Sequence, residues 1–278
     1  VKATVNKGST DLNKIVNITV EEKPTGEISL GAGVGTDGNT IGFAVSENNY
    51  MGKGIKLRSS LRLSTDTVRG QFSILNPNYK YSDKSLFTNI QSTQTDKLSN
   101  NGYKSTKTGF SLGTKFEQYE NFYFNPSINT FYENLETSTG ATAALKKQEG
   151  NNFDTSFKYS RDYDMRNQRY MTSDGYRSQF SQSIPLISDV YSLANSYEIS
   201  VYNKLPNDMI TNVSFYASAI NSLSDEDVRI SDRLSLGAKR LRGFERFKTG
   251  PIDNGDYIGG NFASSVNLST TLPMFFQS

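Results

Sequence analysis

The sequence contains no cysteine, no histidine and no tryptophan. Without a thiol or an imidazole, the chain can form no disulfide, no thiolate nucleophile, no Ser-His-Asp triad and no zinc site of the usual Cys/His type. Its 30 Lys and Arg residues nearly balance its 28 Asp and Glu residues, so it lacks the strongly basic field on which nucleic-acid binding depends. We therefore expect no nucleic-acid partner, no metal site and no cofactor.

Long apolar runs and linkers are also missing. No stretch approaches the ~20 consecutive apolar residues of a membrane-spanning helix, and no Pro-rich or Gly/Ser-rich tract divides the chain. The first eight residues lack the form of a signal peptide, and there is no initiator Met. We expect one main domain, in a mature or excised part of a longer protein.

What the sequence does contain is 16 Tyr, 17 Phe and a period of two. In residues 55–64 the odd positions are mostly apolar and the even positions are polar: Ile55, Leu57, Ser59, Leu61 and Leu63 against Lys56, Arg58, Ser60, Arg62 and Ser64. The same alternation recurs in residues 153–160, 197–202, 213–219 and 262–268. Because alternate side chains of a strand point to opposite faces, this pattern predicts strands with one apolar and one polar face.

Turn signals divide the chain into segments of similar length. They include Gly52-Lys53-Gly54, Asn76-Pro77-Asn78, Ser173-Asp174-Gly175 and Pro206-Asn207-Asp208. The segments between such turns predict about twelve strands from residue 26 to residue 271, most of them about ten residues long. Tilted strands of roughly 9–11 residues cross a bilayer, whereas strands of soluble proteins average roughly 5–6.

Two all-β folds accept this pattern. A soluble sandwich or barrel buries the apolar faces, whereas a transmembrane antiparallel β-barrel turns them to lipid around a polar lumen. Strand length and the long polar connection at 223–257 favour the membrane barrel. Residues 1–23 contain two short β-like runs around Gly8, and about 23 residues are too few to bury a core of their own. They resemble the last hairpin of a small domain that is cut at its start.

Several short motifs occur in order along the chain: Asn49-Tyr50-Met51-Gly52-Lys53-Gly54, Asn76-Pro77, Ser173-Asp174-Gly175, and Leu241-Arg242-Gly243-Phe244 followed by Gly250-Pro251. In this order and spacing they resemble the Omp85 superfamily, over the whole chain. The likeness is greatest to the members that assemble outer-membrane β-barrels. The family's Val-Arg-Gly-Phe/Tyr motif in the sixth external loop stands here as Leu-Arg-Gly-Phe, a mild departure.

The resemblance implies a domain organisation. Residues 1–23 are expected to be the C-terminal remnant of a POTRA domain, and residues 24–278 to be a partial Omp85 barrel whose external loop 223–257 carries the motif. A complete barrel of this family has sixteen strands and ends on an aromatic residue, whereas this chain ends Phe275-Phe276-Gln277-Ser278. We therefore expect a truncated barrel that lacks about four strands, with sheet edges that are costly in lipid.

The resemblance also implies a function without covalent chemistry, namely the insertion of β-barrel proteins into the bacterial outer membrane, with the POTRA side in the periplasm. The implied partners are unfolded outer-membrane β-barrel proteins, accessory lipoproteins of an assembly complex, periplasmic chaperones and the lipid bilayer. An Omp85-type polypeptide translocator and a passive porin or structural barrel remain alternatives. The lack of histidine argues against a hydrolase, because the usual nucleophile needs a base.

The loop motif comprises Leu241, Arg242, Gly243 and Phe244. Gly243 permits a backbone turn, Phe244 can bury its ring, and the planar fork of Arg242 can pair with carboxylates, although a basic loop can also be a solvated surface. The resemblance implies that this loop folds into the lumen, where its arginine meets acidic residues. Asn267 and Ser269 stand where relatives often carry glutamate. They are possible neutral partners, and the main acidic partner is expected elsewhere.

The first strand of the predicted barrel is rich in glycine. After Glu27, the side chains of Ile28, Leu30, Ala32 and Val34 are expected on the lipid face, and Ser29, Gly31, Gly33 and Gly35 on the lumenal face. Glycine weakens a strand, and it also relieves crowding or lets a strand bend. The sharper hypothesis is that this strand separates from the last one and that its free edge templates an incoming client strand.

Overall fold

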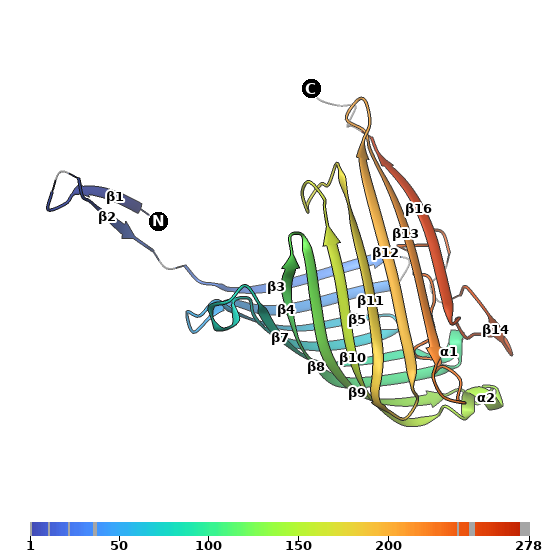
Figure 1. The fold of residues 1–278 in the computed structure, drawn as a ribbon. Helices are drawn as coiled ribbons and strands as arrows, with labels where there is room; N and C mark the ends of the chain where they lie inside the picture. Colours follow the sequence, from blue (N-terminus) through green and yellow to red (C-terminus); the bar gives the residue numbers. More distant parts are fainter. Residues whose placement is uncertain are drawn as a thin grey trace.

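The computed structural model describes residues 2–10, 12–21, 23–35, 38–237, 239–244 and 248–272. Strands β1 (Lys2–Lys7) and β2 (Lys14–Thr19) pair as an antiparallel hairpin that stands apart from the rest of the chain (Figure 1). The two β-like runs expected in residues 1–23 are therefore present. Their assignment to a POTRA domain stays a prediction.

The rest of the chain forms one twelve-stranded antiparallel sheet in which neighbours in sequence pair in space. Its strands are β3 (Gly26–Gly35), β4 (Gly38–Tyr50), β5 (Ile55–Ser64), β6 (Thr67–Asn76), β7 (Ser85–Lys97), β8 (Tyr103–Tyr119), β9 (Phe122–Thr137), β10 (Gly150–Asp164), β11 (Gly175–Ser188), β12 (Ser192–Lys204), β13 (Ile210–Ser222) and β16 (Phe262–Thr271). The predicted number of strands and their outer limits are confirmed. The strands of the middle of the sheet are longer than predicted, up to 17 residues in β8.

Short elements lie between the strands. They are the 3-10 turn η1 (Tyr79–Tyr81), the helices α1 (Leu98–Asn101) and α2 (Ala143–Lys146), and the small hairpin of β14 (Ile252–Asp253) and β15 (Asp256–Tyr257). Within the described residues, no helix has the length and apolar character needed to cross a membrane.

The sheet curls strongly, so that β3 to β6 and β12 to β16 lie on opposite sides of a concave space (Figure 1). In the part of the chain that the structure describes, β3 and β16 each have one neighbour in this sheet, and the barrel does not close between them. Residues 273–278, on which part of the expected truncation rests, lie outside the described residues.

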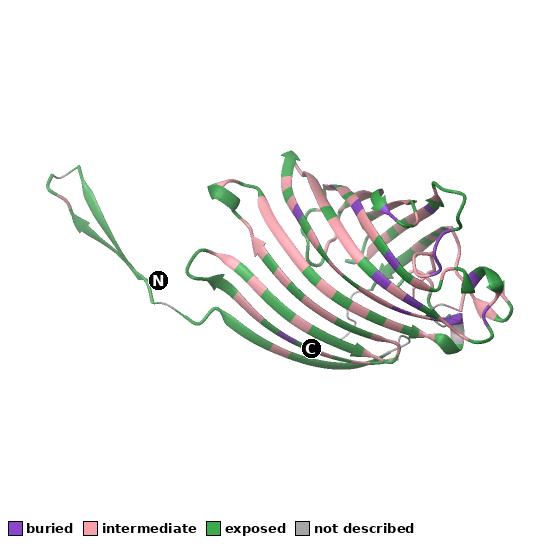
Figure 2. Ribbon diagram, turned by 90° about the horizontal axis from the view of Figure 1, so that it is seen from below, coloured by how far each residue is buried: buried purple, intermediate pink, exposed green. Residues whose placement is uncertain are grey.

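The two faces of the sheet have opposite chemistry. Polar side chains from β6 to β12, which include Arg69, Asn89, Lys107, Asp154 and Ser192, line one cavity and so mark the concave face. The alternating residues on the convex face are largely apolar and exposed. Figure 2 shows the alternation of exposed and less exposed residues as stripes along the strands. A soluble β fold would bury the apolar face. The observed orientation is that of a membrane barrel with a polar lumen.

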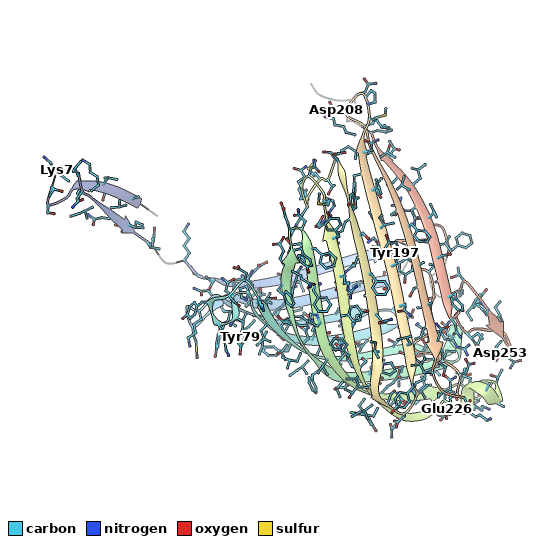
Figure 3. All side chains as sticks on the ribbon, in the orientation of Figure 1. Lys7, Tyr79, Tyr197, Asp208, Glu226 and Asp253 are labelled. Atoms are coloured by element: carbon cyan, nitrogen blue, oxygen red, sulfur yellow. The ribbon has the colours of Figure 1, made fainter. Side chains whose placement is uncertain are left out.

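The sheet has two rims, which Figure 3 marks with labelled residues. The turn rim carries short connections such as η1, near Tyr79, and the β12–β13 turn at Asp208. The hairpin β1–β2 joins the sheet at this rim. The loop rim carries α1, α2 and the long connection 223–261, which includes Glu226 and Asp253.

A small apolar core lies at the loop rim, not in the lumen. Its buried members are Tyr103, Leu135, Ala141, Leu145 and Ile230, with Ile258 packed against them. They come from β8, β9, the α2 segment and the 223–261 connection. Burial of these side chains therefore holds the long loop against the sheet, since each removes apolar surface from water.

Gly175, which follows the β10–β11 turn, allows a test of the turn geometry. Gly175 has a φ of +95°, and a Cβ atom there would lie 2.2 Å from the Met165 carbonyl oxygen. We expect Gly175→Ala to destabilise the full-length protein by about 1–3 kcal/mol, because this φ is strained for alanine and its Cβ atom would collide with the carbonyl oxygen. Urea unfolding in detergent micelles measures the change. The control is Gly140→Ala, where a Cβ atom meets nothing within 4 Å; equal effects of both substitutions would contradict the prediction.

Candidate functional site

The 223–261 loop turns back onto the inner wall of the sheet through a buried ion pair. Arg229 Nε lies 3.3 Å from Glu133 Oε2 on β9, and both side chains are buried, at 7 % and 2 % exposure. The hydroxyls of Ser105 and Ser231 also donate hydrogen bonds to the Glu133 carboxylate. Because two charges lose their hydration here, the extra hydrogen bonds are needed to offset that cost. Glu133 is thus the first anchor of the loop.

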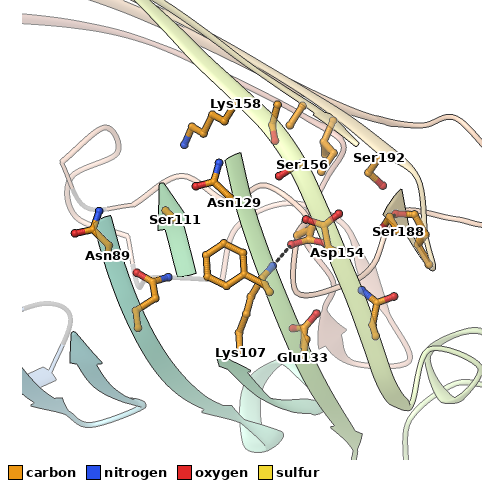
Figure 4. A pocket seen from close by; sticks show the side chains of 18 of the residues that line it. Asn89, Lys107, Ser111, Asn129, Glu133, Asp154, Ser156, Lys158, Ser188 and Ser192 are labelled. Carbon is orange, nitrogen blue, oxygen red and sulfur yellow. Dashed lines mark hydrogen bonds and ion pairs between the residues drawn. The ribbon is translucent and has the colours of Figure 1, made fainter. Parts of the chain in front are cut away.

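A second ion pair joins the loop to the neighbouring strand. Lys107 on β8 reaches Asp232 of the loop at 3.2 Å, the contact marked by the dashed line in Figure 4. The pair borders a polar cavity of about 400 Å³ in the lumen, which Glu133 and Asp154 also line. Charges of both signs therefore face a space that favours water and polar groups over apolar ones.

Arg240 is the third anchor, and its partners lie on β12 and β13. Its Nη2 atom lies 2.8 Å from Glu198 Oε2 on β12, and its guanidinium carbon is 3.5 Å from the ring centre of Tyr216 on β13. Glu198 and Tyr216 are register partners, so one guanidinium covers a cross-strand pair. An ion pair and a cation–π contact thus hold the same side chain.

The predicted motif follows directly after this anchor. Gly243 has a φ of +83°, in keeping with the turn expected there. Phe244, expected to bury its ring, is 57 % exposed, and the anchoring contact is made instead by Arg240. Leu241 is half-buried and Arg242 is exposed. Within residues 2–272, excluding the undescribed positions, no hydrogen bond or ion pair joins Arg242 to another residue, so its role stays a prediction.

The two possible lumenal partners lie on β16, and they do not meet Arg242. Asn267 donates a hydrogen bond to Ser265 Oγ at 3.4 Å. Both Asn267 and Ser269 alternate with the exposed, apolar Val266 and Leu268, which places them on the concave face as expected. No hydrogen bond links either side chain to Arg242 among the described residues. The acidic groups that do hold the loop are Glu133, Asp232 and Glu198.

The pairing of these three carboxylates with their basic partners was not predicted from the sequence. Glu133 and Glu198 lie on the polar faces of their strands, so alternation could have placed them in the lumen. No local signal in the sequence pairs Glu133 with Arg229 or Glu198 with Arg240. The partners are far apart along the chain, as Ser231 shows, which also binds Glu133 and is 98 residues from it.

The first barrel strand is an edge. All ten residues of β3 pair with β4, from Gly26 opposite Glu47 to Gly35 opposite Gly38, and the sheet order gives β3 no second neighbour among the described residues. Ile28, Leu30 and Val34 are exposed on the convex face, at 74 %, 78 % and 88 %, as predicted. Glu27 sits at the start of the strand, where it accepts a hydrogen bond from Ser29.

The glycines of β3 are not required by crowding. A Cβ atom on Gly31 or Gly33 would meet nothing within 4 Å in the described structure. On β8 the situation differs, because a Cβ atom on Gly109 would lie 2.0 Å from the Thr130 carbonyl oxygen. The glycines of β3 therefore leave this strand with few side-chain contacts, which weakens its hold on the sheet.

A comparison with protein families identifies the chain's relatives. The model of the Omp85 superfamily domain matches residues 49–278. This chain belongs to the Omp85 superfamily. The resemblance noted in the sequence is thereby confirmed, and so is its all-β barrel fold.

Members of the superfamily from animals and a bacterium are similar to the chain. It is 23 % identical to the Sorting and assembly machinery component 50 homolog of Bos taurus over 245 residues, which cover 86 % of this chain and 52 % of that protein. It is 22 % identical to the outer membrane protein assembly factor BamA of Neorickettsia risticii over 280 residues, which cover 94 % of this chain and 36 % of that protein. The chain thus spans about half, or less, of these relatives.

A solved structure shares the fold. The crystal structure of BamA from Haemophilus ducreyi lacking POTRA domains 1–3 matches with a TM-score of 0.85 and 20 % identity, over 100 % of this chain and 59 % of that one. At this level of identity the likeness establishes an Omp85-type barrel architecture.

Because Glu133 is buried, we expect removal of its charge to have a large effect on the attachment of the loop. We expect Glu133→Gln to destabilise the attachment of the loop by about 3–5 kcal/mol, because Arg229 is left buried without a counter-charge. Urea unfolding and the rate of protease cleavage within 223–261 measure the effect in the full-length protein.

The control lies on the same strand. Glu136 pairs with Lys104 at 3.8 Å and is 57 % exposed, so Glu136→Gln is expected to cost at most about 1 kcal/mol. Equal cleavage rates for the two variants would show that Glu133 does not anchor the loop.

Proposed function

We propose that the protein containing this chain folds and inserts β-barrel proteins into the bacterial outer membrane, with the free edge of β3 as the template. The observation that carries the proposal is this edge. Among the described residues β3 pairs with β4 alone, and Gly31 and Gly33 leave it with few side-chain contacts on its lumenal face. Membership of the Omp85 superfamily and relatives named for sorting and assembly support it.

The driving force is physical and requires no catalytic group. In lipid, each unpaired backbone N–H or C=O group costs several kcal/mol, so an exposed strand edge binds any strand that can satisfy it. An incoming client strand adds to β3 by β-augmentation, and alternation of its apolar and polar residues sets its register. Burial of the client's apolar face in lipid then makes the step favourable.

The proposed orientation follows from the two rims. The hairpin β1–β2 and the turn rim would face the periplasm, where the hairpin would end a POTRA domain, and the loop rim would face outward. Unfolded outer-membrane proteins, periplasmic chaperones and accessory lipoproteins are the proposed partners on the periplasmic side.

A polypeptide translocator is the second candidate, because the lumen holds a polar cavity of about 400 Å³. The loop contacts favour the insertase over it and over a passive porin. Anchors at Glu133 on β9 and Glu198 on β12 fix the 223–261 loop to the lumenal wall at two places, and a transported chain would have to displace it.

Stiffening of the first strand tests the template. We expect Gly31→Val with Gly33→Val to stabilise β3 by about 1–2 kcal/mol, and hence to lower the population of opened strand about five- to thirtyfold. The rate at which a client barrel becomes resistant to heat unfolding on gels, with the full-length protein in liposomes, measures insertion. Gly70→Val on β6 is the control, because its Cβ atom also meets nothing within 4 Å. Unchanged insertion with stiffened β3 would refute the template.

Substitutions of Arg242 in the motif and of the neighbouring anchor Arg240 should affect different measurements. We expect Arg242→Ala to slow client insertion about tenfold or more without changing the free energy of unfolding, as for a charge-assisted hydrogen bond that forms only during insertion. Arg240→Ala should instead speed protease cleavage of the loop, because its ion pair and ring contact are lost. Lys239→Ala, an exposed loop cation, is the control for charge alone. Wild-type insertion by the Arg242 variant would remove the motif from the mechanism.

A further inference from the structure

A row of aromatic rings crosses the convex face near the turn rim. Phe116 on β8 contacts Phe124 on β9, with ring centres 5.8 Å apart, and Phe124 contacts Tyr159 on β10 at 5.9 Å. Tyr159 continues the row to Phe180 on β11 at 6.3 Å. In a membrane barrel, aromatic rings of this kind gather at the level of the lipid headgroups. The row thus marks the membrane interface next to the turn rim.

Two cations stand along this row, one at Phe116 and one at Tyr159. Lys84 Nζ lies 5.2 Å from the ring centre of Phe116, and the guanidinium carbon of Arg161 lies 5.5 Å from that of Tyr159. Both cations are exposed. Arg161 is the register partner of both Phe124 and Phe180, so it shares their convex face.

Asp83 precedes Lys84 in the sequence, and the two carboxylates nearest to Arg161 in sequence are occupied elsewhere. Asp162 points to the opposite face and binds Arg177 at 2.7 Å, and Asp164 binds Arg166 at 2.7 Å. Among the described residues, no ion pair joins Lys84 or Arg161 to an acidic side chain. The convex face near the turn rim thus carries two positive charges beside apolar rings, and neither charge is in an ion pair within the described part of the chain.

We propose that Lys84, Phe116, Phe124, Tyr159 and Arg161, here called the interfacial patch, bind an anionic phospholipid. Its phosphate would lie between the two cations, which reach the headgroup level from apolar stems. Its acyl chains would follow the apolar surface towards the loop rim, where Ile128, Phe157 and Ile184 lie side by side in register. A lipid fits better than a protein partner because the patch is part of the lipid-facing wall. Each cation near an anionic surface favours the charged lipid about fivefold.

The absence of tryptophan from the chain permits a direct measurement. Phe122→Trp places a reporter beside the patch, in the full-length protein with any Trp outside this chain replaced by Phe. The protein is reconstituted in phosphatidylcholine vesicles that contain either brominated phosphatidylglycerol or brominated phosphatidylcholine. The ratio of Trp quenching by the two lipids reports the local preference for the anionic lipid.

We expect the reporter protein to prefer phosphatidylglycerol, and Lys84→Gln with Arg161→Gln to lower that preference at least fivefold. Lys84→Arg with Arg161→Lys should retain it, which separates charge from a change in folding. The matched control is Lys158→Gln, which removes a cation from the same strand on the lumenal face. An unchanged preference in the double Gln variant, or an equal loss with Lys158→Gln, would overturn the proposal.

Discussion

The constraint on which this structure depends is that a peptide group in hydrocarbon must find a hydrogen-bond partner within the protein. It explains why the sheet is built from strands of 10 to 17 residues with unbroken antiparallel pairing from β3 to β16. It also gives the two outer edges their importance, since they are the places where the requirement is unmet among the described residues. An Omp85 barrel that exposes such an edge has a means of attracting a strand without any chemical reaction.

The surrounding lipid also changes where apolar and polar side chains lie, compared with a soluble protein. Because the convex face meets lipid, the lumen can be polar, and a loop that enters it must be held by charges and hydrogen bonds in place of apolar packing. Glu133 shows what this requires, since its carboxylate receives Arg229 and two serine hydroxyls. Apolar burial returns at the loop rim, where Leu135 and Ile230 pack together.

The alternation of residues within single strands made much of the fold predictable. Contacts between residues far apart in the sequence could not be predicted in this way. The alternation in β5 from Ile55 to Ser64 is a property of one strand, so the sequence suffices to find the strand and its faces. The partners of Glu133 and Glu198 depend on how a loop crosses the lumen. Lys239, Arg240 and Arg242 are basic residues of one short segment, and nothing in their order shows that Arg240 is the one that reaches the wall. Similarly, Gly31 and Gly109 look alike in sequence, but only the surroundings of Gly109 exclude a side chain.

The positions of the loop anchors connect the lumen to the edges. Glu133 lies on β9 and Glu198 on β12. The loop that binds both connects β13 to β16 and lies against the concave face. Such a tie resists flattening of this half of the sheet, because flattening would pull the two anchors apart and expose a buried ion pair. The β3 edge lies beyond the tied strands, where β3 is held by β4 alone. The curvature of β9 to β13 is therefore maintained by contacts that do not involve β3.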